Sequence, residues 1–147
     1  MTVDAERLQV WGETLCRLTA ADAGAAATAL GIPGSVVRRS DQWDVEPPPP
    51  GTARLMLVAG PDGIGHLDVL LAGSAVTRAD LDARFGSGRD IPRAGPGRPH
   101  RLAYHVAPPG APFTCELFAC FAEEPAAATP ANEVILRRDR VSAPRRP

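Results

Sequence analysis

The sequence predicts an α+β domain: two N-terminal helices, then a β-hairpin, a short helix and three further strands forming one antiparallel sheet with helices packed on one face. Three observations predict this fold class. Apolar residues recur at helical spacing near the N-terminus, a Pro-Asp-Gly turn separates two apolar runs, and apolar residues alternate in the second half. The 147 residues suit one domain, which we expect over residues 1–141, with a frayed Arg- and Pro-rich tail at 142–147.

The first element is an amphipathic helix over residues 3–18. Leu8, Trp11, Leu15 and Leu18 follow one apolar stripe of this segment, which therefore faces the core.

A second, alanine-rich helix is expected at about 20–30. Thr19 and Asp22 have the spacing of a variant capping box, and Gly31 and Pro33 are stop signals. Side chains this small favour close packing in the core over a partner-binding face.

Residues 33–52 are predicted to be irregular, and they include four consecutive prolines at 47–50. Because proline lacks an amide donor and favours polyproline II, we expect a stiff surface connector; a ligand for proline-reading modules is the alternative. Trp43 either covers the core edge or lies exposed for binding.

A β-hairpin is expected next, with strands at 53–59 and 65–72 on either side of the Pro-Asp-Gly turn. In the second strand, His66 and Asp68 are the polar exceptions, and they point to the same side because they lie two residues apart.

A short helix at about 78–85 has Thr77 and Asp80 as a capping pair and ends at Gly86. Residues 86–99 contain four glycines and three prolines, so we expect an irregular loop.

Three strands are expected at about 100–107, 113–122 and 133–138, the first two joined by a proline-stiffened turn at 108–112. The arginine-rich segment from Arg137 onward is expected to fray.

Composition excludes several function classes. All sixteen basic residues are arginine, so Schiff-base and P-loop chemistry, which need a lysine, are excluded. The net charge of −1 gives no reason to expect nucleic acid or an anionic membrane as partner. The acidic opening has no signal pattern, and no apolar run approaches the roughly 18 residues of a membrane span. We therefore expect a cytoplasmic protein.

The cysteines and histidines give no disulfide or metal pattern. Cys16, Cys115 and Cys120 are an odd number, and the last two face opposite sides of one strand. We expect buried, unreactive thiols, no metal site and no cofactor.

Strand register brings one histidine beside one carboxylate. If the apolar faces of the two strands that follow the loop coincide, Tyr104 pairs with Leu117, and His105 pairs with Glu116 on the opposite face. An adjacent carboxylate orients an imidazole and raises its pKa, which makes this pair the best acid/base candidate. A structural cross-strand pair on a solvated face is the alternative.

The arginines of the glycine-rich loop are the other candidate site. Arg89, Arg93, Arg98 and Arg101 lie in or just after this loop, and guanidinium groups pair with carboxylate or phosphate. These four residues are predicted to bind a small anionic ligand; a flexible, solvated loop is the alternative.

Three function hypotheses follow. The first, which the sequence favours, is a non-catalytic binding or accessory protein whose partner is an unknown protein or a small anionic ligand; a homodimer is left open. The second is a small cofactor-free enzyme of the isomerase, cyclase or lyase type, with His105 as general base oriented by Glu116. Nucleic-acid binding through the arginines is least favoured, because the net charge is near zero and a single tyrosine leaves few stacking platforms.

Overall fold

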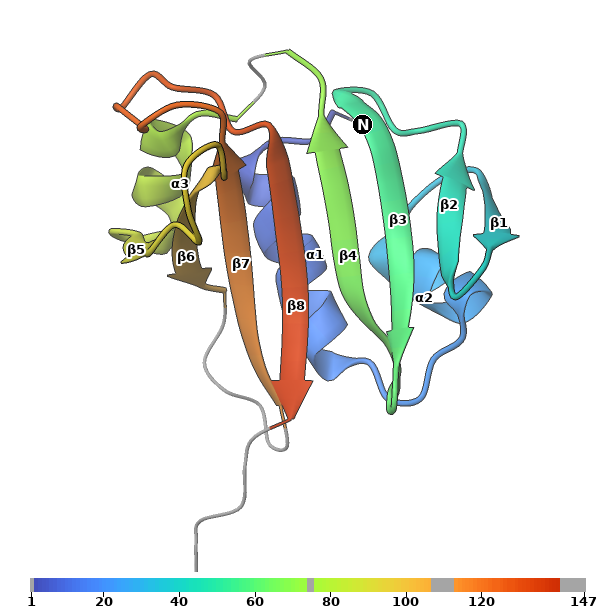
Figure 1. Cartoon of the computed structure of the whole chain (residues 1–147). Coiled ribbons are helices and arrows are strands. Elements are labelled where there is room, and N and C mark those ends of the chain that lie inside the picture. Colours follow the sequence, from blue (N-terminus) through green and yellow to red (C-terminus); the bar gives the residue numbers. More distant parts are fainter. Residues whose placement is uncertain (1, 74–75, 107–112, 141–147) are drawn as a thin grey trace, which may run out of the picture.

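A computed structural model describes residues 2–73, 76–106 and 113–140. Figure 1 shows one antiparallel sheet with the helices on one face, so the predicted fold class is confirmed. Within the described residues the sheet has eight strands, more than the sequence indicated. The turn predicted at 108–112 and the tail predicted at 142–147 lie outside the described residues.

The element bounds are as follows. The helices are α1 (Ala5–Arg17), α2 (Ala23–Leu30) and α3 (Arg78–Phe85). The strands are β1 (Ser35–Arg39), β2 (Gln42–Glu46), β3 (Thr52–Gly60), β4 (Gly63–Leu71), β5 (Arg89–Ile91), β6 (His100–His105), β7 (Phe113–Phe121) and β8 (Glu133–Arg140). Their order in the sheet is β1-β2-β3-β4-β8-β7-β6-β5.

Side-chain caps determine where the helices begin. The Asp22 carboxylate accepts a hydrogen bond from the amide of Ala25, so α2 begins at Ala23, later than the predicted start near residue 20. Thr77 and Asp80 form the predicted reciprocal capping box of α3, and the helix ends at Phe85 as expected.

The segment predicted to be irregular contains a hairpin, which corrects the expectation for 33–52. β1 and β2 pair through a two-residue turn in which Ser40 has a φ of 63°, and β2 continues the sheet by pairing with β3. Two five-residue strands carry too little alternation to be recognised, and pairing with β3 stabilises them.

One smaller expectation was also wrong. Residues 89–91 form β5 inside the predicted loop, because their backbone pairs with β6.

The proline segment connects β2 to β3, and three of its four prolines are exposed, as expected of a surface connector. Pro49 is buried, and its carbonyl accepts hydrogen bonds from the amide and hydroxyl of Thr52.

The core lies between the helices and one face of the sheet, which we call the covered face. The Trp11 side chain is fully buried, and its indole N–H donates to the carbonyl of Leu30 at 3.0 Å. Gly12 lets α1 approach the sheet closely, since a Cβ there would lie 2.3 Å from Cγ1 of Val106.

Two attachments join α1 to the covered face. Cys16 and Cys115 form a disulfide between α1 and β7, so the prediction of free thiols was wrong for these two residues. They are 99 residues apart in sequence, and only the packing of α1 on the sheet brings them together.

Arg138 provides the second attachment, and it corrects the prediction of a frayed segment from Arg137 onward. β8 continues to Arg140, and the buried guanidinium of Arg138 donates to the carbonyls of Leu15, Leu18 and Asp62. Burial lowers the pKa of Arg138, and three accepting carbonyls compensate for the loss of water. The arginine therefore serves as a cap for the end of α1.

Candidate functional site

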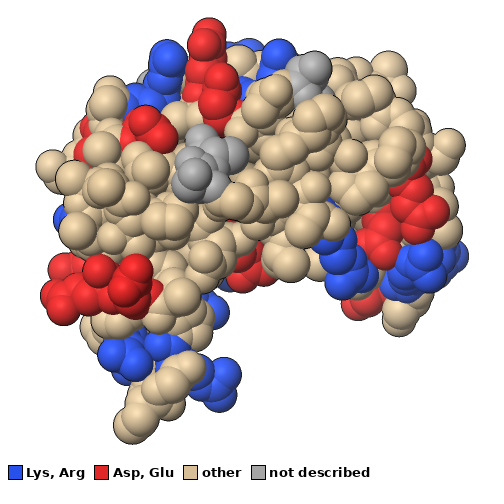
Figure 2. All heavy atoms as spheres, turned by 90° about the horizontal axis from the view of Figure 1, so that it is seen from above, with Lys and Arg blue, Asp and Glu red and all other residues tan. Residues whose placement is uncertain are grey.

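The face of the sheet opposite the helices, here called the open face, is covered by no helix of the described chain. Figure 2 shows the molecule from above, with this face along its lower side, where the surface is hollowed between two projecting ends. Strand register assigns these side chains to the open face: Asp44, Arg54, Met56, Val58, His66, Asp68, Leu70, Arg101, Ala103, His105, Glu116, Phe118, Cys120, Glu133, Ile135 and Arg137.

A mainly apolar row crosses the middle of the open face. Met56, Asp68, Ile135, Phe118 and Ala103 are consecutive cross-strand partners on β3, β4, β8, β7 and β6. Met56 is only 9% exposed and Ala103 only 5%, although no described helix covers them. Neighbouring side chains of the open face thus shield both ends of this row from water.

Asp68 is the one carboxyl in this row. Its Oδ1 atom is buried without a hydrogen-bond partner among the described residues. Burial is the main cause that raises the pKa of Asp68 to about 7; the neighbouring carboxyl of Glu133 contributes in the same direction, and Arg54 opposes the shift. The carboxyl is therefore close to half protonated at neutral pH.

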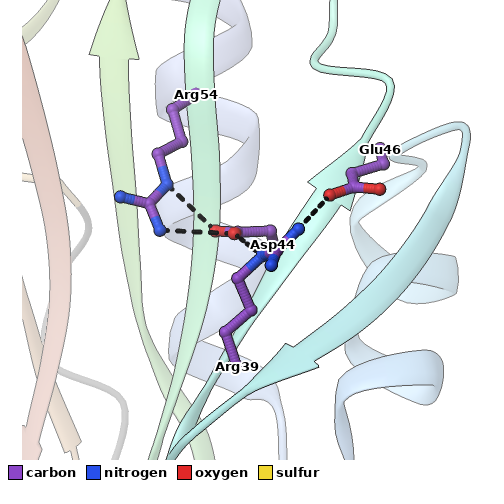
Figure 3. A network of polar contacts seen from close by, with 4 residues as sticks. All are labelled: Arg39, Asp44, Glu46 and Arg54. Atoms are coloured by element: carbon purple, nitrogen blue, oxygen red, sulfur yellow. Dashed lines mark hydrogen bonds and ion pairs between the residues drawn. The ribbon is translucent and has the colours of Figure 1, made fainter.

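Asp44, on the same face, lies in a complete ion-pair network (Figure 3). Its carboxylate accepts two hydrogen bonds from Arg54, at 3.0 and 3.2 Å, and lies 2.7 Å from Nε of Arg39. Arg39 also bonds Glu46 at 2.8 Å. The hydrogen bonds from Arg54 are the main cause of a lowered pKa at Asp44. Because the charges compensate one another, we assign this network to holding β1 and β2 against β3.

The predicted register of β6 and β7 is correct. Tyr104 pairs with Leu117 and is buried, and His105 lies opposite Glu116 on the open face. No hydrogen bond joins these two described side chains; Oε2 of Glu116 lies 3.7 Å from Arg89 instead. The imidazole of His105 is exposed, and Glu116 does not orient it in this structure. Both residues line a shallow hollow of about 220 Å³ with Arg89 and Tyr104.

The four predicted loop arginines separate into two places. Arg89 lies beside Glu116, whereas Arg93, Arg98 and Arg101 together line a hollow of about 120 Å³ at the β5–β6 end of the sheet. The other walls are the apolar side chains of Ile91, Pro92, Ala94 and Pro99. Within the described ranges, none of the three arginines of this hollow forms an ion pair with an acid, although Arg93 donates to the carbonyl of Arg98 at 3.1 Å.

Sequence analysis missed the middle of the open face, although it placed His66 and Asp68 on one side. The signal available was the sheet parity itself, which puts Met56, Phe118 and Ile135 on the face away from the helices. Cys120 is the remaining free cysteine among the described residues, and it is buried as expected; burial raises its pKa to about 11.

The described residues include no group of three or more His, Cys, Asp or Glu side chains placed to hold a metal ion. None of the described helices combines the length and apolarity needed to cross a membrane. Comparison of the chain with family models, with curated proteins and with solved structures finds no match.

Proposed function

We propose that this chain is a non-catalytic binding protein whose ligand lies on the open face of the sheet. The observation that carries the proposal is the hollow on this face (Figure 2), together with the mainly apolar row of cross-strand partners that crosses the middle of the face and that no described helix covers. A sheet face of this kind is normally buried against another layer, and a concave apolar surface with a few polar groups is the usual form of a binding site.

The polar groups support binding over catalysis. Glu116 contacts Arg89 rather than orienting His105, while Asp68 keeps a buried oxygen without a partner among the described residues. A buried, unsatisfied oxygen costs free energy in the free protein, and a ligand that donates a hydrogen bond would remove that cost.

The test compares two variants in which an exposed apolar side chain is replaced by glutamate, one on the open face and one in the helix layer. Leu70 is 38% exposed on the open face, and Val10 is 43% exposed on the outer side of α1. Because both residues are exposed, both variants should fold; Val10→Glu should stay within about 0.5 kcal/mol of wild type, and Leu70→Glu should be less stable by about 1 kcal/mol, since Glu133 lies directly opposite on β8.

The wild type and both variants are used as immobilised baits for a native extract, and retained proteins and small molecules are identified by mass spectrometry. We expect one species that the wild type and Val10→Glu retain in equal amounts, and of which Leu70→Glu retains at least tenfold less. The proposal fails if all three baits retain the same species, or if the protein is a strict monomer that retains none.

A further inference from the structure

We propose that the hollow lined by Arg93, Arg98 and Arg101 holds the carboxylate of a small amphipathic anion whose apolar body lies on the open face. This inference rests on the proposed binding function and names the chemical class of its ligand. It assigns one end of the ligand to the β5–β6 end of the sheet and the other end to the middle.

Charge is the first argument. Three arginines line one hollow, and no acid among the described residues forms an ion pair with any of them. Arginines elsewhere on the open face have such partners, as Arg54 has Asp44 and Arg137 has Asp139. Cations gathered without a counter-charge favour an anionic ligand, and the planar guanidinium fork suits a carboxylate.

Size is the second argument. The hollow has a volume of about 120 Å³, whereas sites that enclose a whole organic ligand span roughly 300–1,000 Å³. It therefore holds one functional group, and the rest of the ligand must lie outside it. The walls formed by Ile91, Pro92 and Pro99 are apolar, so they suit the first carbons next to a charged group.

The arrangement of the open face gives the direction of the ligand. Arg101 lies on β6 beside Ala103, and from Ala103 the apolar row continues through Phe118 and Ile135 toward the middle of the sheet. The carboxyls of Asp68 and Glu133 disfavour an anion in that middle region. An anionic end at the arginines and an apolar body along the row satisfy both constraints.

Isothermal titration calorimetry with decanoate, below its micelle concentration and at fixed ionic strength, tests the proposal. Decanol and inorganic phosphate are the matched probes, since each carries only one of the two features. We expect decanoate to bind at least tenfold more tightly than either, because charge-assisted hydrogen bonds and apolar contact both contribute.

Variants locate the site. Arg101→Gln and the double variant Arg93→Gln/Arg98→Gln should each weaken decanoate binding about tenfold. Arg17→Gln, at an exposed position of α1 in the helix layer, removes the same charge and should leave the affinity unchanged. Leu70→Glu should weaken binding of decanoate while leaving phosphate unaffected.

Equal binding of decanol and decanoate, equal binding of phosphate and decanoate, or no binding of decanoate would each overturn the proposal. So would an equal effect of Arg17→Gln and Arg101→Gln. If decanoate fails but the bait experiment still shows a species that depends on Leu70, the ligand class is wrong and the binding function stands. If no species depends on Leu70, the binding function itself fails.

Discussion

Polar side chains are bonded differently on the two faces of the sheet, as two adjacent residues of β8 show. On the covered face, Arg138 is buried, donates to three backbone carbonyls and lies over the ring of Phe113, 4.2 Å from its centre. On the open face, the Arg137 side chain is 54% exposed and, among the described residues, pairs with Asp139. Within the described part of the chain, the buried polar group of the covered face is thus satisfied, whereas Asp68 on the open face keeps a buried oxygen without a partner.

The difference between the faces bears on function because stability and ligand binding depend on different residues. A side chain that the fold needs should be costly to replace whatever the ligand. Replacing a side chain that serves binding should leave the free energy of unfolding nearly unchanged or even increase it. The same replacement should change retention of the ligand. Neighbouring residues on one strand allow this distinction to be measured.

Leu136 and Ile135 give the largest expected difference in stability. Leu136 is fully buried on the covered face, so Leu136→Ala should lower the free energy of unfolding by about 3 kcal/mol. Ile135 is partly exposed on the open face, and Ile135→Ala should cost about half as much. Urea unfolding followed by circular dichroism measures both, and equal losses would show that the open face is as tightly packed as the covered one.

Arg138 and Arg137 form the second pair. Arg138→Met removes the hydrogen bonds to the end of α1, and we expect a loss of about 2 kcal/mol, since relief of charge burial offsets part of a larger cost. Arg137→Met removes one exposed ion pair and should change stability by less than about 0.5 kcal/mol.

Hydrogen exchange checks the mechanism of the Arg138 effect. Amides in the last turn of α1 should exchange faster in Arg138→Met and at the wild-type rate in Arg137→Met. If protection of α1 is unchanged in both, Arg138 is not its cap.

Much of the covered face could be predicted from the sequence, because its signals are local. Because apolar residues alternate in β6 and β7, their apolar faces must coincide, and the length of the connecting turn then selects the pairing of Tyr104 with Leu117. The same holds for α3, whose cap residues lie within three positions of each other.

What escaped prediction depends on contacts between distant segments. The disulfide of Cys16 with Cys115 needs α1 to lie across β7, and no local pattern gives that placement. Likewise, the sequence placed Glu116 opposite His105 correctly, but β5 was not predicted, and with it comes the 3.7 Å contact of Arg89 with the Glu116 carboxylate. The hairpin of β1 and β2 is short, and it depends on β3 and on the Asp44 network.

Asp68 gives the smallest expected effect and the most direct test of the open face. Its pKa is about 7 in the folded protein, against 3.8 for an ordinary Asp carboxyl, so the folded state keeps a proton that the unfolded chain has already released between about pH 4 and 7. The free energy of unfolding of wild type should therefore fall as the pH rises through this window. Such a difference in pKa would correspond to about 4 kcal/mol, but solvent screens the half-buried group, and we expect about 1 kcal/mol.

Asp68→Asn resembles the protonated carboxyl, so its stability should not fall across that window, and it should exceed that of wild type by about 1 kcal/mol at pH 8. Asp44→Asn is the opposing control. The pKa of Asp44 is lowered by Arg54, so its contribution is present at neutral pH and is lost as the pH falls through the folded pKa. The two variants should thus differ from wild type with opposite sign at pH 8 in urea unfolding. A constant difference between Asp68→Asn and wild type from pH 4.5 to 8 would mean that Asp68 is ionised throughout, and that the middle of the open face is as well hydrated as an ordinary surface.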